Sequence, residues 1–194
     1  MKFEIFKFGN VTSTNDMAIK LIKNEKKELG CVYAEVQTNG RGKNGNKWIS
    51  NKGNLFMSIF FPLKKNYPPF NEFSIINPII VSDLIKNYCS FKKISFKFPN
   101  DVFVNEKKIC GILQEVISLN SKKFLIIGIG LNIISNPIIK KNYLTTSIAL
   151  ESNKKPSVLK VVNEMTLSYE NFFDKLNNYS FLRFKQRANL IALN

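Results

Sequence analysis

Short apolar runs separated by polar breaks recur along most of the chain, and their spacing predicts both strands and helices. Alternating or continuous apolar runs predict strands over residues 3–8, 31–36, 55–61, 94–98, 102–104, 108–117 and 124–134. Helical spacing predicts a helix from Ser13 or Thr14 (the N-cap) to about Lys27, and others over residues 69–88, from 145 onward and over 181–193. Pro78 is expected to kink or divide the second helix. The pattern predicts an α+β fold with a mixed or antiparallel sheet that carries helices on one side.

Length and composition limit the number of domains, and the high positive charge requires an explanation. The 194 residues favour a single domain, and 44% hydrophobic residues suffice for a core. The net charge is +15, but 26 of the 29 basic residues are lysines, which occur as scattered pairs. Dispersed charge of this kind is typical of a solvated surface, and a polyanion-binding face is the alternative.

Missing residue types exclude several chemistries. Without histidine, the chain can hold no Ser-His-Asp triad, Cys-His dyad or His-ligated zinc. Cys31, Cys89 and Cys110 are too far apart for a CxxC pair and are expected to be buried, reduced thiols. No apolar stretch approaches the ~20 residues of a membrane span, and none resembles a signal peptide. A soluble, cytoplasmic protein with no membrane partner is expected.

One polar loop carries the strongest chemical signal. Residues 37–53 hold four of the nine glycines, together with Arg41 and three lysines, and contain no acidic residue. Glycines let backbone N–H groups converge on an anion, and Arg41 offers a planar fork for carboxylate or phosphate. Trp48, the single tryptophan, could stack on a base. A solvated surface loop is the alternative, and the spacing is not that of a Walker loop.

Four further segments contain candidate ligand-binding residues, each with a simpler structural explanation. Ser13-Thr14-Asn15 could hold a small polar group or only cap a helix, and Lys97 to Asp101 could be only a β-turn. Lys108 begins an otherwise apolar strand, where a lone ammonium is expensive to bury. The glycines of residues 128–132 could serve only close packing.

In this order, the segments resemble the biotin–protein ligase family. Its Gly-Arg-Gly-Arg-x-Gly-x-x-Trp loop is similar to residues 40–48, and its Ser-Thr-Asn matches residues 13–15. Its Lys-Trp-Pro-Asn-Asp, Lys-x-x-Gly-Ile-Leu and Gly-Ile-Gly-x-Asn are similar to residues 97–101, 108–113 and 128–132. Lys43 stands where the family usually has a second arginine, and Phe98 replaces the usual tryptophan. The resemblance spans residues 1 to about 190.

The resemblance implies a biotin–lipoate ligase fold, similar to class II aminoacyl-tRNA synthetases: one catalytic domain over residues 1–194, its largely antiparallel sheet flanked by helices. Only 12 residues precede Ser13, so we expect no N-terminal winged helix-turn-helix. We also expect no small C-terminal β-barrel domain. A monofunctional ligase without operator binding would follow.

The implied reaction joins biotin to ATP as biotinyl-5′-AMP and then transfers biotin to a lysine of a biotin carboxyl carrier protein, such as that of acetyl-CoA carboxylase. The resemblance assigns biotin to Ser13, Thr14, Asn15, Gln37, Gly40, Arg41, Gly42, Lys43, Lys108 and Gly111. It assigns ATP or the adenylate to Arg41, Lys43, Trp48, Asn100, Asp101, Lys108 and Asn132. Lys108, Arg41 and Asp101 are the implied catalytic residues. Mg²⁺ is implied by ATP, with its protein ligand unknown.

Two alternatives remain open from the sequence. A lipoate–protein ligase or octanoyltransferase shares the fold class, although no cysteine stands in a matching acyl-accepting motif. A basic nucleic-acid-binding domain would explain the charge but not the motifs. No sequence-specific DNA partner is expected, and a homodimer stays open.

Overall fold

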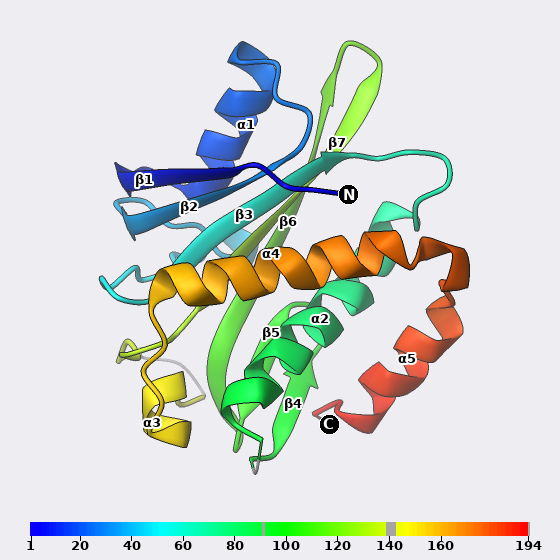
Figure 1. Cartoon of the computed structure of the whole chain (residues 1–194). Coiled ribbons are helices and arrows are strands. Elements are labelled where there is room, and N and C mark those ends of the chain that lie inside the picture. The colour runs from blue at the N-terminus through cyan, green and yellow to red at the C-terminus, as the bar shows by residue number, and fades with distance from the viewer. Residues whose placement is uncertain (91, 139–142, 194) are drawn as a thin grey trace.

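A seven-stranded mixed sheet forms the middle layer of the molecule (Figure 1). The computed structural model describes residues 1–90, 92–138 and 143–193. The strand order is β1-β2-β3-β7-β6-β5-β4, with β1 and β2 parallel and every other pair antiparallel. The strands are β1 (Ile5–Val11), β2 (Gly30–Gln37), β3 (Leu55–Pro62), β4 (Ile94–Lys97), β5 (Asp101–Val104), β6 (Lys107–Leu119) and β7 (Lys122–Leu131). The predicted α+β class and largely antiparallel sheet are confirmed.

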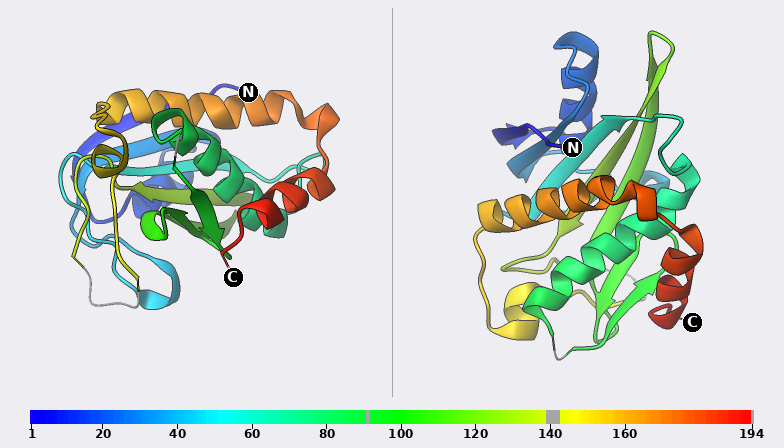
Figure 2. Two further views of the ribbon diagram at one scale, coloured as in Figure 1. Left: turned by 90° about the horizontal axis from the view of Figure 1, so that it is seen from below. Right: turned by 45° about the vertical axis from the view of Figure 1, so that its right-hand side comes forward.

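Helices cover both faces of this sheet. They are α1 (Thr14–Asn24), α2 (Phe73–Tyr88), α3 (Ile148–Ser152), α4 (Val158–Asp174) and α5 (Phe181–Leu190). Figures 1 and 2 show α2 and α4 on one side of the sheet and α1 on the other. The expectation of helices on one side is therefore wrong. Strand alternation provides the reason: in β2, Cys31 and Tyr33 join the core beneath α2 and α4, whereas Val32 packs in the cluster with α1.

The long helix α2 passes through Pro78 without division. Pro78 is the sixth residue of α2, so its ring removes one backbone hydrogen bond near the start of the helix. Most of α2 is buried in the core, including Ile76 and Val81. Packing of this kind outweighs the local cost of proline, and the expected division is wrong.

Capping residues end α3 and begin α4. Asn153 adopts φ 56° after α3, and Ser157 then caps α4 by accepting a hydrogen bond from the Lys160 N–H. The buried face of α4 includes Val161, Met165 and Tyr169. The last helix ends at Leu190, three residues before the predicted limit.

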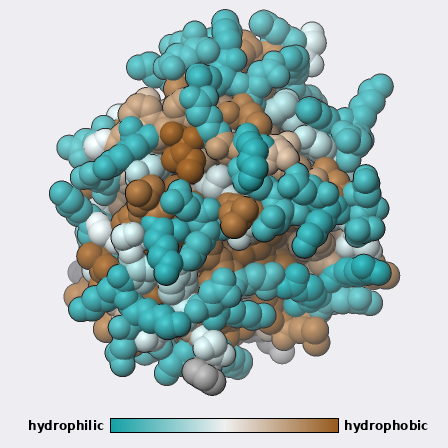
Figure 3. All heavy atoms as spheres, viewed as in Figure 1, coloured by the Kyte–Doolittle hydropathy of each residue, from teal (hydrophilic) through white to brown (hydrophobic). Residues whose placement is uncertain are grey.

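The surface is consistent with scattered lysines. Hydrophilic side chains cover most of the face that carries α4 and α2 (Figure 3). Within the described part of the chain, no helix has the length and apolar character needed to cross a membrane.

Candidate active site

One cleft of about 340 Å³ brings the predicted segments together. Its walls are the start of α1, the end of β2, the loop before β3, the start of β5, the first half of β6 and the end of β7. The cleft is lined by these predicted residues: Ser13, Thr14, Asn15, Gln37, Arg41, Gly42, Lys43, Trp48, Asn100, Asp101, Lys108, Gly111 and Asn132. Gly40 alone among the predicted residues does not line it.

Gly40 instead lies behind the cleft wall. A Cβ built there would be 2.6 Å from the Trp48 carbonyl oxygen and 2.9 Å from Gln37 Nε2. Its role is close packing of the loop, and the expectation that it contacts the ligand directly gains no support.

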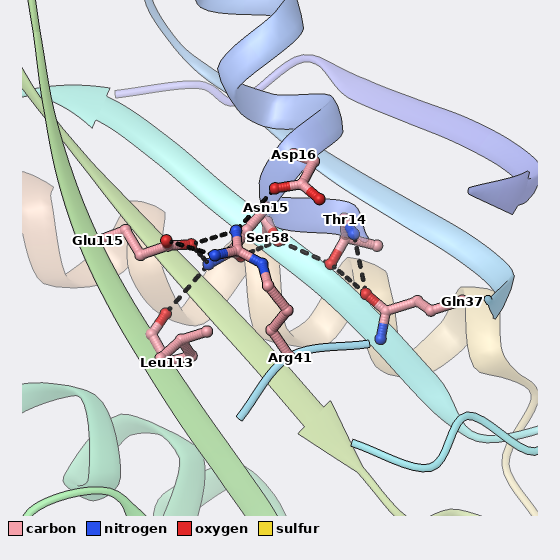
Figure 4. A network of polar contacts seen from close by, with 8 residues as sticks. All are labelled: Thr14, Asn15, Asp16, Gln37, Arg41, Ser58, Leu113 and Glu115. Carbon is pink, nitrogen blue, oxygen red and sulfur yellow. Dashed lines mark hydrogen bonds and ion pairs between the residues drawn. The ribbon is translucent and has the colours of Figure 1, made fainter. Parts of the chain in front are cut away.

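A buried polar chain lies at the start of α1 (Figure 4). Gln37 Oε1 accepts a hydrogen bond from the Thr14 N–H at 2.8 Å and lies 3.1 Å from the Thr14 hydroxyl oxygen. The Ser58 hydroxyl lies 2.8 Å from Thr14 Oγ1 and 2.5 Å from Asn15 Oδ1. The Ser13 side chain makes no capping hydrogen bond although Ser13 is the N-cap residue. The Ser13 side chain therefore has no capping role, and it lines the cleft together with Thr14 and Asn15.

Arg41 is paired with two carboxylates. Its Nη1 and Nη2 donate to Glu115 Oε1 and Oε2, each at 2.8 Å, and Nη2 also donates to Asp16 at 2.7 Å. Burial by itself lowers the pKa of Arg41, but hydrogen bonds and charges from Glu115 and Asp16 raise it above its usual value. Arg41 is thus a fixed cation that connects the loop to Asp16 of α1 and to Glu115 of β6.

The loop of residues 37–53 folds against itself and against the sheet. The Gly42 N–H donates to the Asn46 carbonyl at 2.6 Å, and the Trp48 N–H donates to the Gly40 carbonyl at 2.8 Å. The Trp48 ring covers the paired glycines Gly111 and Gly130, where an added Cβ would overlap it. Trp48 Nε1 is buried without a hydrogen-bond partner.

Lys108 is the cation deepest in the cleft. Its side chain is 12% exposed and its Nζ lies 2.7 Å from Asp101 Oδ1. The ammonium also lies 5.5 Å from the Trp48 ring centroid and 5.3 Å from that of Tyr143. The pairing of β5 with β6 shifts register between Val102 and Phe103, opposite residues 108–110. This bulge lets Lys108 and Gly111, three positions apart, share the cleft wall.

Two amide side chains complete the predicted set. Asn132 donates to the Thr146 carbonyl at 2.9 Å, while its own Oδ1 is buried without a partner. A buried acceptor of this kind is normally satisfied by a protein group, an ordered water or a ligand. Asn100 donates to the Ile112 carbonyl at 3.1 Å, and its N–H closes the predicted turn on Lys97. Asn100 is therefore both a turn residue and a cleft residue.

Sequence reasoning missed Asp16, Ser58, Glu115 and Tyr143. Ser58 is a lone hydroxyl within an otherwise apolar strand, and that was a usable signal. Glu115 shares the alternation of Gly111 and Leu113 along β6, which also places it on the cleft side. No sequence pattern marked Tyr143.

The predicted thiols and metal chemistry can also be compared with the structure. Cys31, Cys89 and Cys110 are all free and buried, as expected. Burial raises the pKa of Cys31 to about 12. Among the described residues, no group of three or more histidine, cysteine or acidic side chains could hold a metal ion, and Asp101 is the sole carboxylate lining the cleft.

Fold and cleft together define a domain whose cleft places buried polar groups beside Arg41, Lys43 and Lys108. A family model for the biotin/lipoate A/B protein ligase family matches residues 7–132. The chain belongs to this family.

Individual proteins similar to this chain are also members of this family. The chain is 27% identical over 171 residues to the bifunctional ligase/repressor BirA of Escherichia coli, covering 84% of this chain and 52% of BirA. The biotin protein ligase of Leishmania major, solved with biotinyl-5-AMP, aligns with a TM-score of 0.83 and 26% identity over 98% of this chain and 81% of that one. The Aquifex aeolicus enzyme, solved with biotin and ATP, gives a TM-score of 0.80 and 26% identity over 98% and 78%. The chain spans about half the length of the curated relatives it matches.

Proposed function

We propose that this protein activates biotin with ATP to form biotinyl-5′-AMP and pyrophosphate, and then transfers biotin to a lysine of a biotin carboxyl carrier protein. The observation that carries the proposal is a single cleft. It joins the Thr14–Gln37–Ser58 polar chain to the cations Lys43 and Lys108. A neutral hydrogen-bonding ring system and an anionic tail would each find a complementary end.

The polar end supports biotin over lipoate. A ureido group presents N–H donors and a carbonyl acceptor, which the hydroxyls of Ser13 and Thr14 and the amides of Asn15 and Gln37 can satisfy. The dithiolane ring of lipoate offers no N–H or carbonyl group. Thr14 and Asn15 are each 3% exposed and hydrogen-bonded within the chain, so the polar groups here are held in place to bind a ureido group, whereas an apolar ring would gain no hydrogen bond from them.

The cationic end supports attack of a carboxylate on the α-phosphate. Two anions must meet, and their repulsion is the main barrier that a positioned ammonium can lower. Lys108 would bridge the biotin carboxylate and the α-phosphate, while Lys43 approaches from the loop. Asp101, 2.7 Å from Lys108, would orient that ammonium and then face the incoming carrier lysine. Biotin's carboxylate oxygen forms the new P–O bond as the bond to pyrophosphate breaks.

The adenine would lie between Trp48 and Asn132. The unpartnered Oδ1 of Asn132 would accept from the exocyclic amine, and Trp48 would offer a stacking surface.

Mg²⁺ fits the donor set as a companion of ATP. One carboxylate, Asp101, lines the cleft, and Mg²⁺ commonly takes one or two carboxylates with substrate phosphates. When bound, the ion would neutralise phosphate charge. Most of its ligands would come from the nucleotide.

The finer assignments also belong to this proposal. The cleft draws its lining from Ser13 to Thr145, which supports our assignment of the catalytic domain to residues 1–194. We place the reaction in the cytoplasm, a reducing compartment that three free cysteines favour. We assign no sequence-specific DNA partner, because the lysines are dispersed. A homodimer is compatible with the proposal but not required by it.

The test is incubation of the protein with ATP, Mg²⁺ and either biotin or lipoate, with the product identified by mass spectrometry. We expect biotinyl-AMP at a rate at least ~10-fold above lipoyl-AMP, because each hydrogen bond that biotin forms and lipoate lacks contributes about 0.5–1.5 kcal/mol. Preferential lipoyl-AMP would establish the lipoate alternative. No adenylate, with salt-sensitive nucleic-acid binding, would favour the nucleic-acid-binding alternative.

A further inference from the structure

Glu115 occupies the junction between the polar end of the cleft and the glycine-rich loop (Figure 4). Its two carboxylate oxygens accept the paired donors of Arg41, each at 2.8 Å. Oε2 also accepts from Asn15 Nδ2 at 2.6 Å. One side chain of β6 thus holds a residue of the loop and a residue of α1 at the same time.

This pairing changes the role of Arg41. The guanidinium is compensated by Glu115 and by Asp16, so the three side chains together carry a charge of −1. Both Nη atoms of Arg41 are engaged, and its Nε is buried without a partner. Arg41 is therefore a tether for the loop rather than a free anion-binding fork.

The same carboxylate fixes a direction of hydrogen bonding. A carboxylate only accepts, so Asn15 must turn its NH₂ toward Glu115 and its Oδ1 toward Ser58. The Ser58 proton is then directed to Asn15 Oδ1, 2.5 Å away. The Thr14 hydroxyl, 2.8 Å from Ser58 Oγ, is then the donor of that pair.

We infer that Glu115 is a positioning residue, which through Asn15 and Arg41 sets the hydrogen-bond polarity of the ureido pocket and holds the loop over the cleft. The inference rests on the proposed function for its ligand, but the tether itself is a property of the ligand-free chain.

Glu115→Gln tests the hydrogen-bond polarity and the loop tether together, because glutamine has the same size as glutamate. A glutamine offers one acceptor oxygen, so Arg41 or Asn15 must face an amide NH₂. We expect the KM for biotin to rise at least 10-fold, with the KM for ATP changed less than threefold. Glu28→Gln is the control, because Glu28 pairs with Lys122 on an exposed surface outside the cleft.

A double-mutant cycle separates tethering from general damage. Arg41→Gln leaves Glu115 and Asp16 facing an anionic ligand, and we expect kcat/KM for biotin to fall about 100-fold. Adding Glu115→Gln removes one of those charges, so the double variant should recover at least threefold over Arg41→Gln alone. If instead the two losses multiply, the inference is overturned.

Hydrogen exchange of the ligand-free protein gives a readout that needs no biotin. The Gly42 and Trp48 amides close the loop on itself, so both single variants should speed their exchange at least fivefold, with no further gain in the double variant. Unchanged exchange in Glu115→Gln overturns the tether even if the enzyme makes biotinyl-AMP. Absence of adenylate in the wild type would refute the proposed function alone, since the exchange experiment still decides the tether.

Discussion

Replacement of Lys108 removes the charge on which the proposed chemistry most depends. In Lys108→Ala the cleft loses an ammonium that is 12% exposed and therefore poorly replaced by solvent. We expect the adenylation rate to fall by a factor on the order of 10² to 10³, about 3–4 kcal/mol, as for loss of one preorganised electrostatic donor.

The structure adds a second consequence. Asp101, 19% exposed, lies 2.7 Å from Lys108 without any ligand, so the variant leaves this carboxylate without its ion-pair partner. A destabilisation of about 1–3 kcal/mol is expected, small enough for the fold to survive. Lys108→Gln leaves less of a cavity and should show the same loss of rate.

Lys107 provides the matched control on the same strand. Its side chain is 45% exposed and lies 4.0 Å from Glu151, outside the cleft. Lys107→Ala should therefore keep the adenylation rate within about twofold, since surface ion pairs contribute little. Single-turnover adenylation, with unfolding followed by circular dichroism, measures both variants. Equal rates for the two, or a larger loss at Lys107, would refute the assignment of Lys108.

Four further outcomes follow from the structure. Residues 40–53 should exchange amide hydrogens more slowly with bound biotinyl-AMP than without it, and equal rates would contradict ligand-dependent ordering. DNA binding should be weak and lost at moderate salt despite the charge of +15, and a sequence-selective complex at physiological salt would oppose this. Gly130→Ala should displace Trp48 and raise the KM for ATP about 10-fold, whereas Gly9→Ala, with open space around it, should not. Burial raises the pKa of Cys31 to about 12, so this thiol should resist alkylation at pH 8. The folded state should lose stability as the pH rises above about 8.5, where the unfolded thiol ionises, and rapid alkylation would contradict burial.

Much of the fold was predictable because local patterns agreed with the final packing. All seven predicted strands formed, and the mixed sheet followed from their lengths and turn signals. The side on which a helix packs was not predictable. Placement of α1 opposite α2 depends on which alternate residues of β2 face each layer, and a single strand with apolar residues on both faces does not specify it.

Sequence motifs predicted which residues line the cleft, but not which side chains pair with one another there. Chemistry-bearing residues such as Lys108 and Asn132 stand out because their types fit poorly with apolar strands. The contact of Arg41 with Glu115 joins residues 74 positions apart, and only the folded sheet brings them together. The bulge at Ile109, next to Lys108 in β6, likewise has no glycine or proline that would predict it.

The central claim is that this cleft activates biotin, and native mass spectrometry of the chain after one turnover tests it most directly. With biotin, ATP and Mg²⁺, the account predicts one biotinyl-5′-AMP retained per chain, and transfer of one biotinyl group to a single lysine when a biotin carrier domain is added. The same experiment with Lys108→Ala should show free protein, and with Lys107→Ala the adenylate complex. A wild-type chain that retains no adenylate, or that retains lipoyl-AMP as readily as biotinyl-AMP, would contradict the account.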